Sequence, residues 1–143
     1  MSSQPRSARS VGTAAVSHHT LMAWQLLSAI LLLAMGGIHL YLVFYGVHGL
    51  LGRLFVLDAV GALALAVAII VLKRRLLVLA TLLSLLFVAG TNLALVLALT
   101  VGLFGIHEVL SFKLVPTTLV VETIGTLVLA VTFPLALRSL RAP

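Results

Sequence analysis

The chain has 143 residues, of which 62% are hydrophobic and 8% are charged, and nine Lys and Arg stand against three Asp and Glu. This composition, with a mean hydropathy of +1.30, excludes a water-soluble domain of this size. The chain has no Cys, which excludes disulfides, thiolate nucleophiles and iron–sulfur ligation. We therefore expect an integral membrane protein.

The first 19 residues are rich in Ser, basic and free of acidic side chains, which predicts a disordered cytoplasmic tail. The apolar run that follows is too long for the core of a secretory signal peptide and has no convincing small-residue cleavage site. Organellar transit peptides share this basic composition, so an import segment stays open as a minor alternative.

Four apolar runs follow, each long enough to cross a bilayer core about 30 Å thick. They cover about residues 20–45, 54–72, 76–104 and 114–137. The runs are continuously apolar and rich in Leu and Ala, whereas the strands of a membrane barrel alternate. The sequence predicts an all-α fold: one four-helix transmembrane bundle over residues 20–138, followed by a cytoplasmic tail, 139–143.

The positions of Lys and Arg predict the orientation, because positive loops stay on the cytoplasmic side. Seven of the nine basic residues fall on the side of the two termini: Arg6, Arg9, Lys73, Arg74, Arg75, Arg138 and Arg141. The other two, Arg53 and Lys113, fall in the opposite connections. Both termini are therefore expected in the cytoplasm, and the positive charge is assigned to topology rather than to nucleic-acid binding.

A polar layer is expected in the extracytoplasmic half of the bundle. His39, Asp58 and Glu122 fall roughly 6 to 12 Å below the outer ends of the first, second and fourth spans, at 1.5 Å per residue. Small and hydroxyl residues lie three and four positions from them, which indicates that they face the interior. Asn92 lies near the middle of the third span, where it is expected to hydrogen-bond across helices.

Five further polar residues are expected in the two outer connections, above this layer: His48, Arg53, His107, Glu108 and Lys113. The third run is longer than a bilayer requires, so it tilts or ends early near Gly102 and Gly105. An early end would let the side chains that follow fold over the mouth of the bundle.

Three interpretations of the polar layer remain open. In the first, His39 pairs with Glu122 or Asp58 and locks the bundle, because paired ionisable groups are the common solution to burial in a membrane. In the second, a metal is held by some of His39, His107, Glu108 and Glu122, or a haem by His39 and His107. No cofactor is the leading expectation, since no Glu-x-x-His register is present. In the third, the layer exchanges protons.

The function expected first is therefore that of a non-catalytic accessory subunit that packs against other membrane subunits or self-associates. Gly and Ala positions such as Gly36, Gly61 and Ala66 allow close helix approach. The alternatives are the metal, haem or proton-coupled site, and binding or transport of a small molecule, quinone or lipid by an oligomer. No familiar catalytic motif is present, so an enzyme is not expected.

The segments GGIHLYLVFYGVHG, GRLFVLDAVGALALA and GLFGIHE resemble those of small, uncharacterised four-helix membrane proteins of high-GC bacteria. The resemblance covers most of the chain beyond the first 19 residues. It implies a multi-pass protein of the bacterial plasma membrane. No activity is known for such proteins, so the resemblance implies none for this chain.

Overall fold

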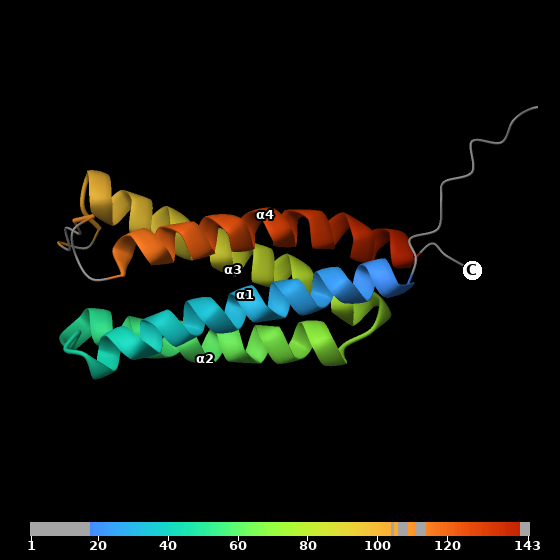
Figure 1. The fold of residues 1–143 in the computed structure, drawn as a ribbon, viewed down its shortest axis with the longest axis horizontal. Helices are drawn as coiled ribbons and strands as arrows, with labels where there is room; N and C mark the ends of the chain where they lie inside the picture. The colour runs from blue at the N-terminus through green and yellow to red at the C-terminus, as the bar shows by residue number, and fades with distance from the viewer. Residues whose placement is uncertain (1–17, 104, 106–108, 111–113, 141–143) are drawn as a thin grey trace, which may run out of the picture.

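The computed structural model describes residues 18–103, 105, 109–110 and 114–140, and these form four helices and their connections. The helices are α1 (His18–Phe44), α2 (Gly49–Val71), α3 (Arg74–Thr100) and α4 (Val115–Ser139). They run side by side as one elongated bundle (Figure 1). The prediction of an all-α four-helix bundle is confirmed.

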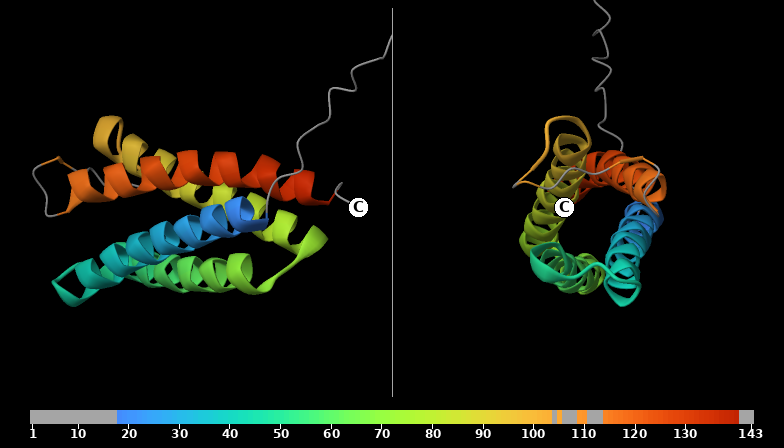
Figure 2. Two further views of the ribbon diagram at one scale, coloured as in Figure 1. Left: turned by 45° about the vertical axis from the view of Figure 1, so that its right-hand side comes forward. Right: turned by 90° about the vertical axis from the view of Figure 1, so that its left-hand side faces the viewer.

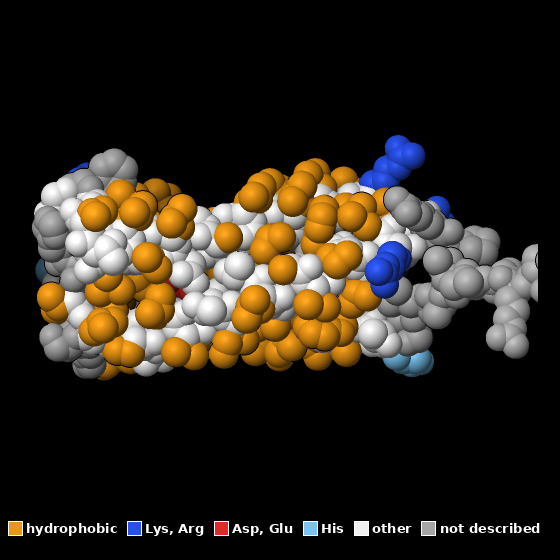
Figure 3. All heavy atoms as spheres, turned by 90° about the horizontal axis from the view of Figure 1, so that it is seen from above, with side chains coloured by type: hydrophobic (Ala, Val, Ile, Leu, Met, Phe, Trp, Pro, Cys, Tyr) orange, Lys and Arg blue, Asp and Glu red, His pale blue; other side chains and the backbone are white. Residues whose placement is uncertain are grey.

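Each helix is long and apolar enough to cross a membrane. With 23 to 27 residues, the helices extend roughly 35 to 40 Å, which exceeds the hydrocarbon core of a bilayer. Hydrophobic side chains cover the side of the bundle, and basic side chains stand out at one end (Figure 3). By length and composition, the chain is a multi-pass membrane protein whose outer surface suits contact with lipid.

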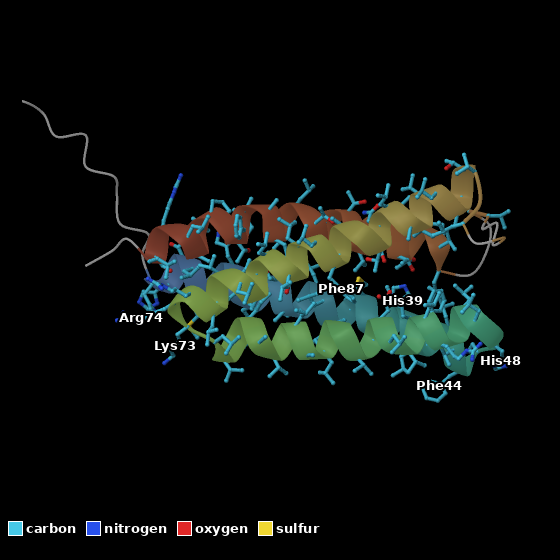
Figure 4. All side chains as sticks on the ribbon, turned by 180° about the vertical axis from the view of Figure 1, so that it is seen from behind. His39, Phe44, His48, Lys73, Arg74 and Phe87 are labelled. Atoms are coloured by element: carbon cyan, nitrogen blue, oxygen red, sulfur yellow. The ribbon has the colours of Figure 1, made fainter. Side chains whose placement is uncertain are left out.

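The two ends of the bundle differ, and we name its halves after them. The proximal half contains the ends at His18 and Ser139 and the short turn between α2 and α3. The distal half contains the connection between α1 and α2 and the one between α3 and α4. Lys73 and Arg74 lie at the proximal end and His48 lies at the distal end (Figure 4).

The helices form a ring in the order α1, α2, α3, α4 (Figure 2). The α1–α2 pair packs over the largest part of its length, and the α2–α3 pair packs over the smallest. Helices α2 and α3 are close at the turn that joins them and diverge toward the distal end (Figures 1 and 2).

The proximal half holds a dense core. Leu32, Ile69, Leu129 and Ala136 are almost fully buried there. The Ser28 and Thr132 hydroxyl oxygens lie 3.0 Å apart across α1 and α4 in a hydrogen bond. Further along, Thr81 and Ser84 each donate to a carbonyl one turn back in their own helix. Buried hydroxyls in this half are thus satisfied within the protein.

Two expected helix ends differ from those observed. The third apolar run extends to about residue 104, but α3 ends at Thr100, close to Gly102, one of the two glycines where the sequence allows an early end. Val101 and Gly102 both donate their backbone N–H groups to the Leu97 carbonyl, and Gly102 has a φ of +82°, a conformation that ends helices. The helix therefore ends just before Gly102, while the apolar run itself continues.

The second helix also begins earlier than expected, at Gly49 rather than Leu54. Arg53 therefore lies in the first turns of α2 instead of in the connection. The charge of Arg53 does not end the span. An exposed Arg near the end of a membrane helix extends its side chain to the interface and does not interrupt the helix.

Candidate functional site

A cavity of about 350 Å³ lies in the distal half of the bundle. All four helices line it, and most of its lining is apolar, including Leu42, Leu95 and Val115. Both acidic residues that the structure describes, Asp58 and Glu122, also line it. A side view of the bundle shows a hollow near the distal end with an acidic side chain at its edge (Figure 3).

His39 lies between the two carboxyl groups. Its Nδ1 atom is 3.3 Å from Asp58 Oδ2, and its Nε2 atom is 3.9 Å from Glu122 Oε1. The three residues come from α1, α2 and α4, and they lie roughly 8 to 14 Å from the distal ends of their helices at 1.5 Å per residue. Figure 4 shows His39 inside the bundle. The structure therefore brings together the three residues at the centre of the expected polar layer.

The local sequence explains why these side chains point inward. In α1, Met35, His39 and Leu42 are all buried, at spacings of four and three residues that share one helix face. In α4, Thr118 and Glu122 are buried in the same way. His39 and Glu122 thus lie on the stripes of α1 and α4 that pack against the neighbouring helices, while Asp58 is only partly buried.

Two polar atoms of this group have no hydrogen-bond partner. His39 Nδ1 and Glu122 Oε2 are buried, and neither donates nor accepts within the structure. Asp58 is close enough to pair ionically with Nδ1, but the geometry is not that of a hydrogen bond. Because a buried polar atom without a partner costs about 1 to 3 kcal/mol, two such atoms beside one cavity require an explanation.

Sequence reasoning missed the aromatic part of the site. The Phe55 ring lies 4.7 Å from the His39 ring, tilted by 44°, and Phe87 also lines the cavity. A helix-face argument identifies the first, because Phe55 lies three residues before Asp58. The sequence pattern gives no such signal for Phe87. Its ring packs against Gly61 of α2, where a Cβ atom would lie 3.1 Å from the ring, so its position depends on the absence of a side chain there.

Asn92 does not join the cavity group. Its Nδ2 atom donates to Thr123 Oγ1 at 3.0 Å, on the outer side of the contact between α3 and α4. The Asn92 side chain is half-buried, and Thr123 is exposed. The expected hydrogen bond across helices is therefore present, but it faces the surroundings of the bundle.

The expected outer residues are only partly described. His48 and Arg53 are exposed at the distal end, where they line a shallow depression with Val47. His107, Glu108 and Lys113 lie outside the described residues.

Metal ligation has limited support. In the part of the chain that the structure describes, no three His or carboxylate side chains are arranged to hold a metal ion. Two of the four candidate ligands, His107 and Glu108, fall outside that part, as does the second His of the expected haem pair. His39, Asp58 and Glu122 lie close together but are not in such an arrangement.

A scan against models of protein families finds no match for this chain, and searches of the curated proteins and of the solved structures find none either. The resemblance noted in the sequence therefore identifies no family. Fold and composition define the protein as a multi-pass membrane protein built as a single four-helix bundle.

Proposed function

We propose that this protein binds a small amphipathic molecule in the distal cavity. One observation carries the proposal: an apolar cavity inside the bundle is lined by His39 and Glu122, and each of these side chains has a buried polar atom, Nδ1 and Oε2, without a hydrogen-bond partner. A ligand with a polar head supplies the partners that these atoms lack.

The dimensions and lining agree with this role. Pockets for small molecules have volumes of about 300 to 1,000 Å³, with mostly apolar walls and a few convergent polar groups. The cavity, at about 350 Å³, is at the small end of that range. His39, Asp58 and Glu122 supply the convergent groups, while Thr91 and Thr118 add hydroxyls to the lining. In this function the site binds and orients a molecule and needs no chemical step.

The test is to identify what copurifies with the protein. Protein purified in a mild detergent is extracted with organic solvent, and the extract is examined by mass spectrometry. We expect one small molecule in near-stoichiometric amount, at least tenfold depleted when His39→Gln and Glu122→Gln are combined. Asn92→Leu, which changes a polar residue outside the cavity, is the control and retains the molecule. Equal amounts in all three proteins, or none in any, contradict the proposal.

The orientation forms part of the proposal, with both termini in the cytoplasm. Among the described residues, the bounds of the helices place Lys73, Arg74, Arg75 and Arg138 at the proximal end and Arg53 near the distal end. The positive-inside rule then assigns the distal cavity to the outer half of the membrane. Because the chain has no Cys, a single Cys introduced at Ser139 or at His48 reports the side directly by labelling with an impermeant maleimide. In intact cells, we expect labelling of the Cys at position 48 and not of the Cys at position 139. The reverse pattern contradicts the proposed orientation.

A second candidate is an accessory role in a membrane assembly, formed with other subunits or between copies of the chain. The pair of Asn92 and Thr123 favours it, because an amide on the outer side of the bundle keeps unused hydrogen-bonding capacity at a depth that faces hydrocarbon. A helix of a neighbouring subunit that forms a hydrogen bond with the Asn92 amide would satisfy this capacity. The test is cross-linking in native membranes: Asn92→Leu is expected to abolish a cross-linked species that His39→Gln leaves intact, and an unchanged pattern contradicts it.

A further inference from the structure

We infer that the molecule bound in the distal cavity is a neutral, ring-headed lipid of the isoprenoid quinone and quinol class, which reaches the cavity from the side, between the distal turns of α2 and α3. This inference rests on the proposed function, since it names the ligand and its route for the same site. It concerns binding alone and includes no redox step.

The walls of the cavity differ in exposure. The lining side chains of α1 and α4, among them Leu42 and Val115, are all buried, so these two helices close the cavity. On α2, by contrast, Leu54 and Leu57 line the cavity while being 41% and 66% exposed. The open side is therefore the one that α2 shares with α3.

This open side faces lipid. Leu54 and Leu57 lie roughly 8 to 12 Å from the start of α2 at Gly49, a depth at which the surface of a spanning helix meets hydrocarbon chains. The same two helices have the least extensive contact in the ring and diverge toward the distal end (Figure 2). A molecule dissolved in the bilayer thus has a direct route, and its long tail can stay in the lipid.

The buried end of the cavity defines the head of the ligand. His39 Nδ1 and Glu122 Oε2 lie on the closed side, and each lacks a hydrogen-bond partner. A ring hydroxyl can donate a hydrogen bond to one of these atoms and accept one from the other, and a ring carbonyl can accept one from an N–H or O–H group. A neutral head suits the site better than a charged one, because moving an ion out of water into a cavity with mostly apolar walls carries a large desolvation cost.

Aromatic side chains flank the route to these atoms. Phe55 comes from α2 and Phe87 from α3, the two helices of the open side, and both line the cavity. Flat rings pack on such side chains in offset or edge-to-face geometry. A planar head that passes between α2 and α3 therefore meets aromatic surface before it reaches the polar end.

The test places a fluorescent reporter at the opening. In a Trp24→Phe background, which removes the one Trp of the chain, Leu57→Trp introduces an indole at the rim of the cavity. Leu63→Trp, also exposed on α2 but outside the cavity lining, is the matched control. Leu54→Trp replaces the first reporter if that variant folds poorly. The probe is a naphthoquinone with one short prenyl tail, titrated into lipid nanodiscs that contain the full chain.

We expect saturable quenching of the rim reporter, at least fivefold stronger than that of the control at low quinone-to-lipid ratio. Adding Glu122→Gln or His39→Gln is expected to remove this excess. Equal, non-saturable quenching of the two reporters overturns the inference, because it reports partitioning into lipid alone.

A lipophilic cation, tetraphenylphosphonium, separates this inference from the proposed function. We expect that it does not displace the quinone. If the cation binds saturably and the quinone does not, the ligand class is wrong while small-molecule binding stands. If neither probe binds and no molecule copurifies, both the class and the proposed function fail.

Discussion

The two halves of the bundle treat buried polar groups in opposite ways. In the proximal half, Ser28 and Thr132 bond to one another, and Thr81 bonds to its own helix. In the distal half, His39 and Glu122 each keep a buried atom without a partner beside a cavity. Hydroxyl groups can satisfy themselves on any helix, whereas ionisable groups need a counterpart that the backbone does not supply. Unsatisfied polar atoms therefore mark where this protein departs from simple packing.

Packing follows the same division. Buried Ala residues, including Ala66 and Ala80, let the helices of the proximal half approach closely. In the distal half, α3 diverges from α2, and the space between them remains as the cavity. The proximal half thus stabilises the bundle while the distal half stays available for a ligand. Four predictions test this division.

The largest expected effect comes from enlarging a buried Ala in each half. Ala80→Leu inserts a large side chain into the dense proximal core and is expected to lower the free energy of unfolding by about 1 to 3 kcal/mol, the usual cost of overpacking. Ala98→Leu, on the same helix, extends into the cavity and is expected to change stability little. Reversible unfolding in mixed detergent micelles measures both, and equal losses contradict a distal cavity.

Two neighbouring glycines of α1 test the closeness of helix packing. A Cβ at Gly36 would lie 3.0 Å from the Ala62 Cβ atom, whereas a Cβ at Gly37 would meet nothing within 4 Å. Gly36→Ala is therefore expected to destabilise the bundle by about 1 kcal/mol, because the α1–α2 contact must open. Gly37→Ala is expected to be neutral or slightly stabilising, since Ala favours the helix. The same unfolding measurement tests both variants. A larger loss of stability for Gly37→Ala than for Gly36→Ala contradicts this packing, because it would show that the face of α1 at Gly37 is the more tightly packed one.

A smaller effect is expected from the hydrogen bond between Ser28 and Thr132. Thr132→Val removes one hydroxyl with little change in shape and is expected to lower stability by about 0.6 kcal/mol, the mean for such bonds in membrane proteins. Ser28→Ala combined with Thr132→Val is expected to lose less than the sum of the two single losses, because the single variants break the same bond. Strict additivity in this double-mutant cycle contradicts a shared bond.

The smallest effect on stability is expected from Glu122→Gln. Glu122 Oε2 has no hydrogen-bond partner, and Oε1 lies 3.9 Å from His39 Nε2. Replacement by a neutral amide of similar shape keeps the packing and removes only this distant pair, so stability is expected to change little. Ligand binding, by contrast, is expected to be lost. A clear loss of stability without any loss of binding would show that His39 and Glu122 lock the bundle instead.

The sequence predicted the polar group well but its surroundings poorly. Counting residues from the ends of the apolar runs gave similar depths for His39, Asp58 and Glu122, because the helical rise is constant. The same count placed Asn92 near the middle of the third span but could not give its direction: its side chain lies on the outer side of the α3–α4 contact, bonded to Thr123. Depth follows from residue number, whereas the direction a side chain faces depends on how each helix is rotated against its neighbours.

The sequence by itself determined that the chain crosses a membrane, that it does so as helices, and which few residues carry charge into the interior. Continuous apolar runs leave no other way to satisfy the backbone in lipid. Only the tertiary structure decided that α3 diverges from α2, that Phe87 reaches the space this leaves, and that His39 and Glu122 each keep a buried atom without a hydrogen bond. Those features depend on helix tilt and rotation, which arise from the packing of all four helices together rather than from the pattern of any one.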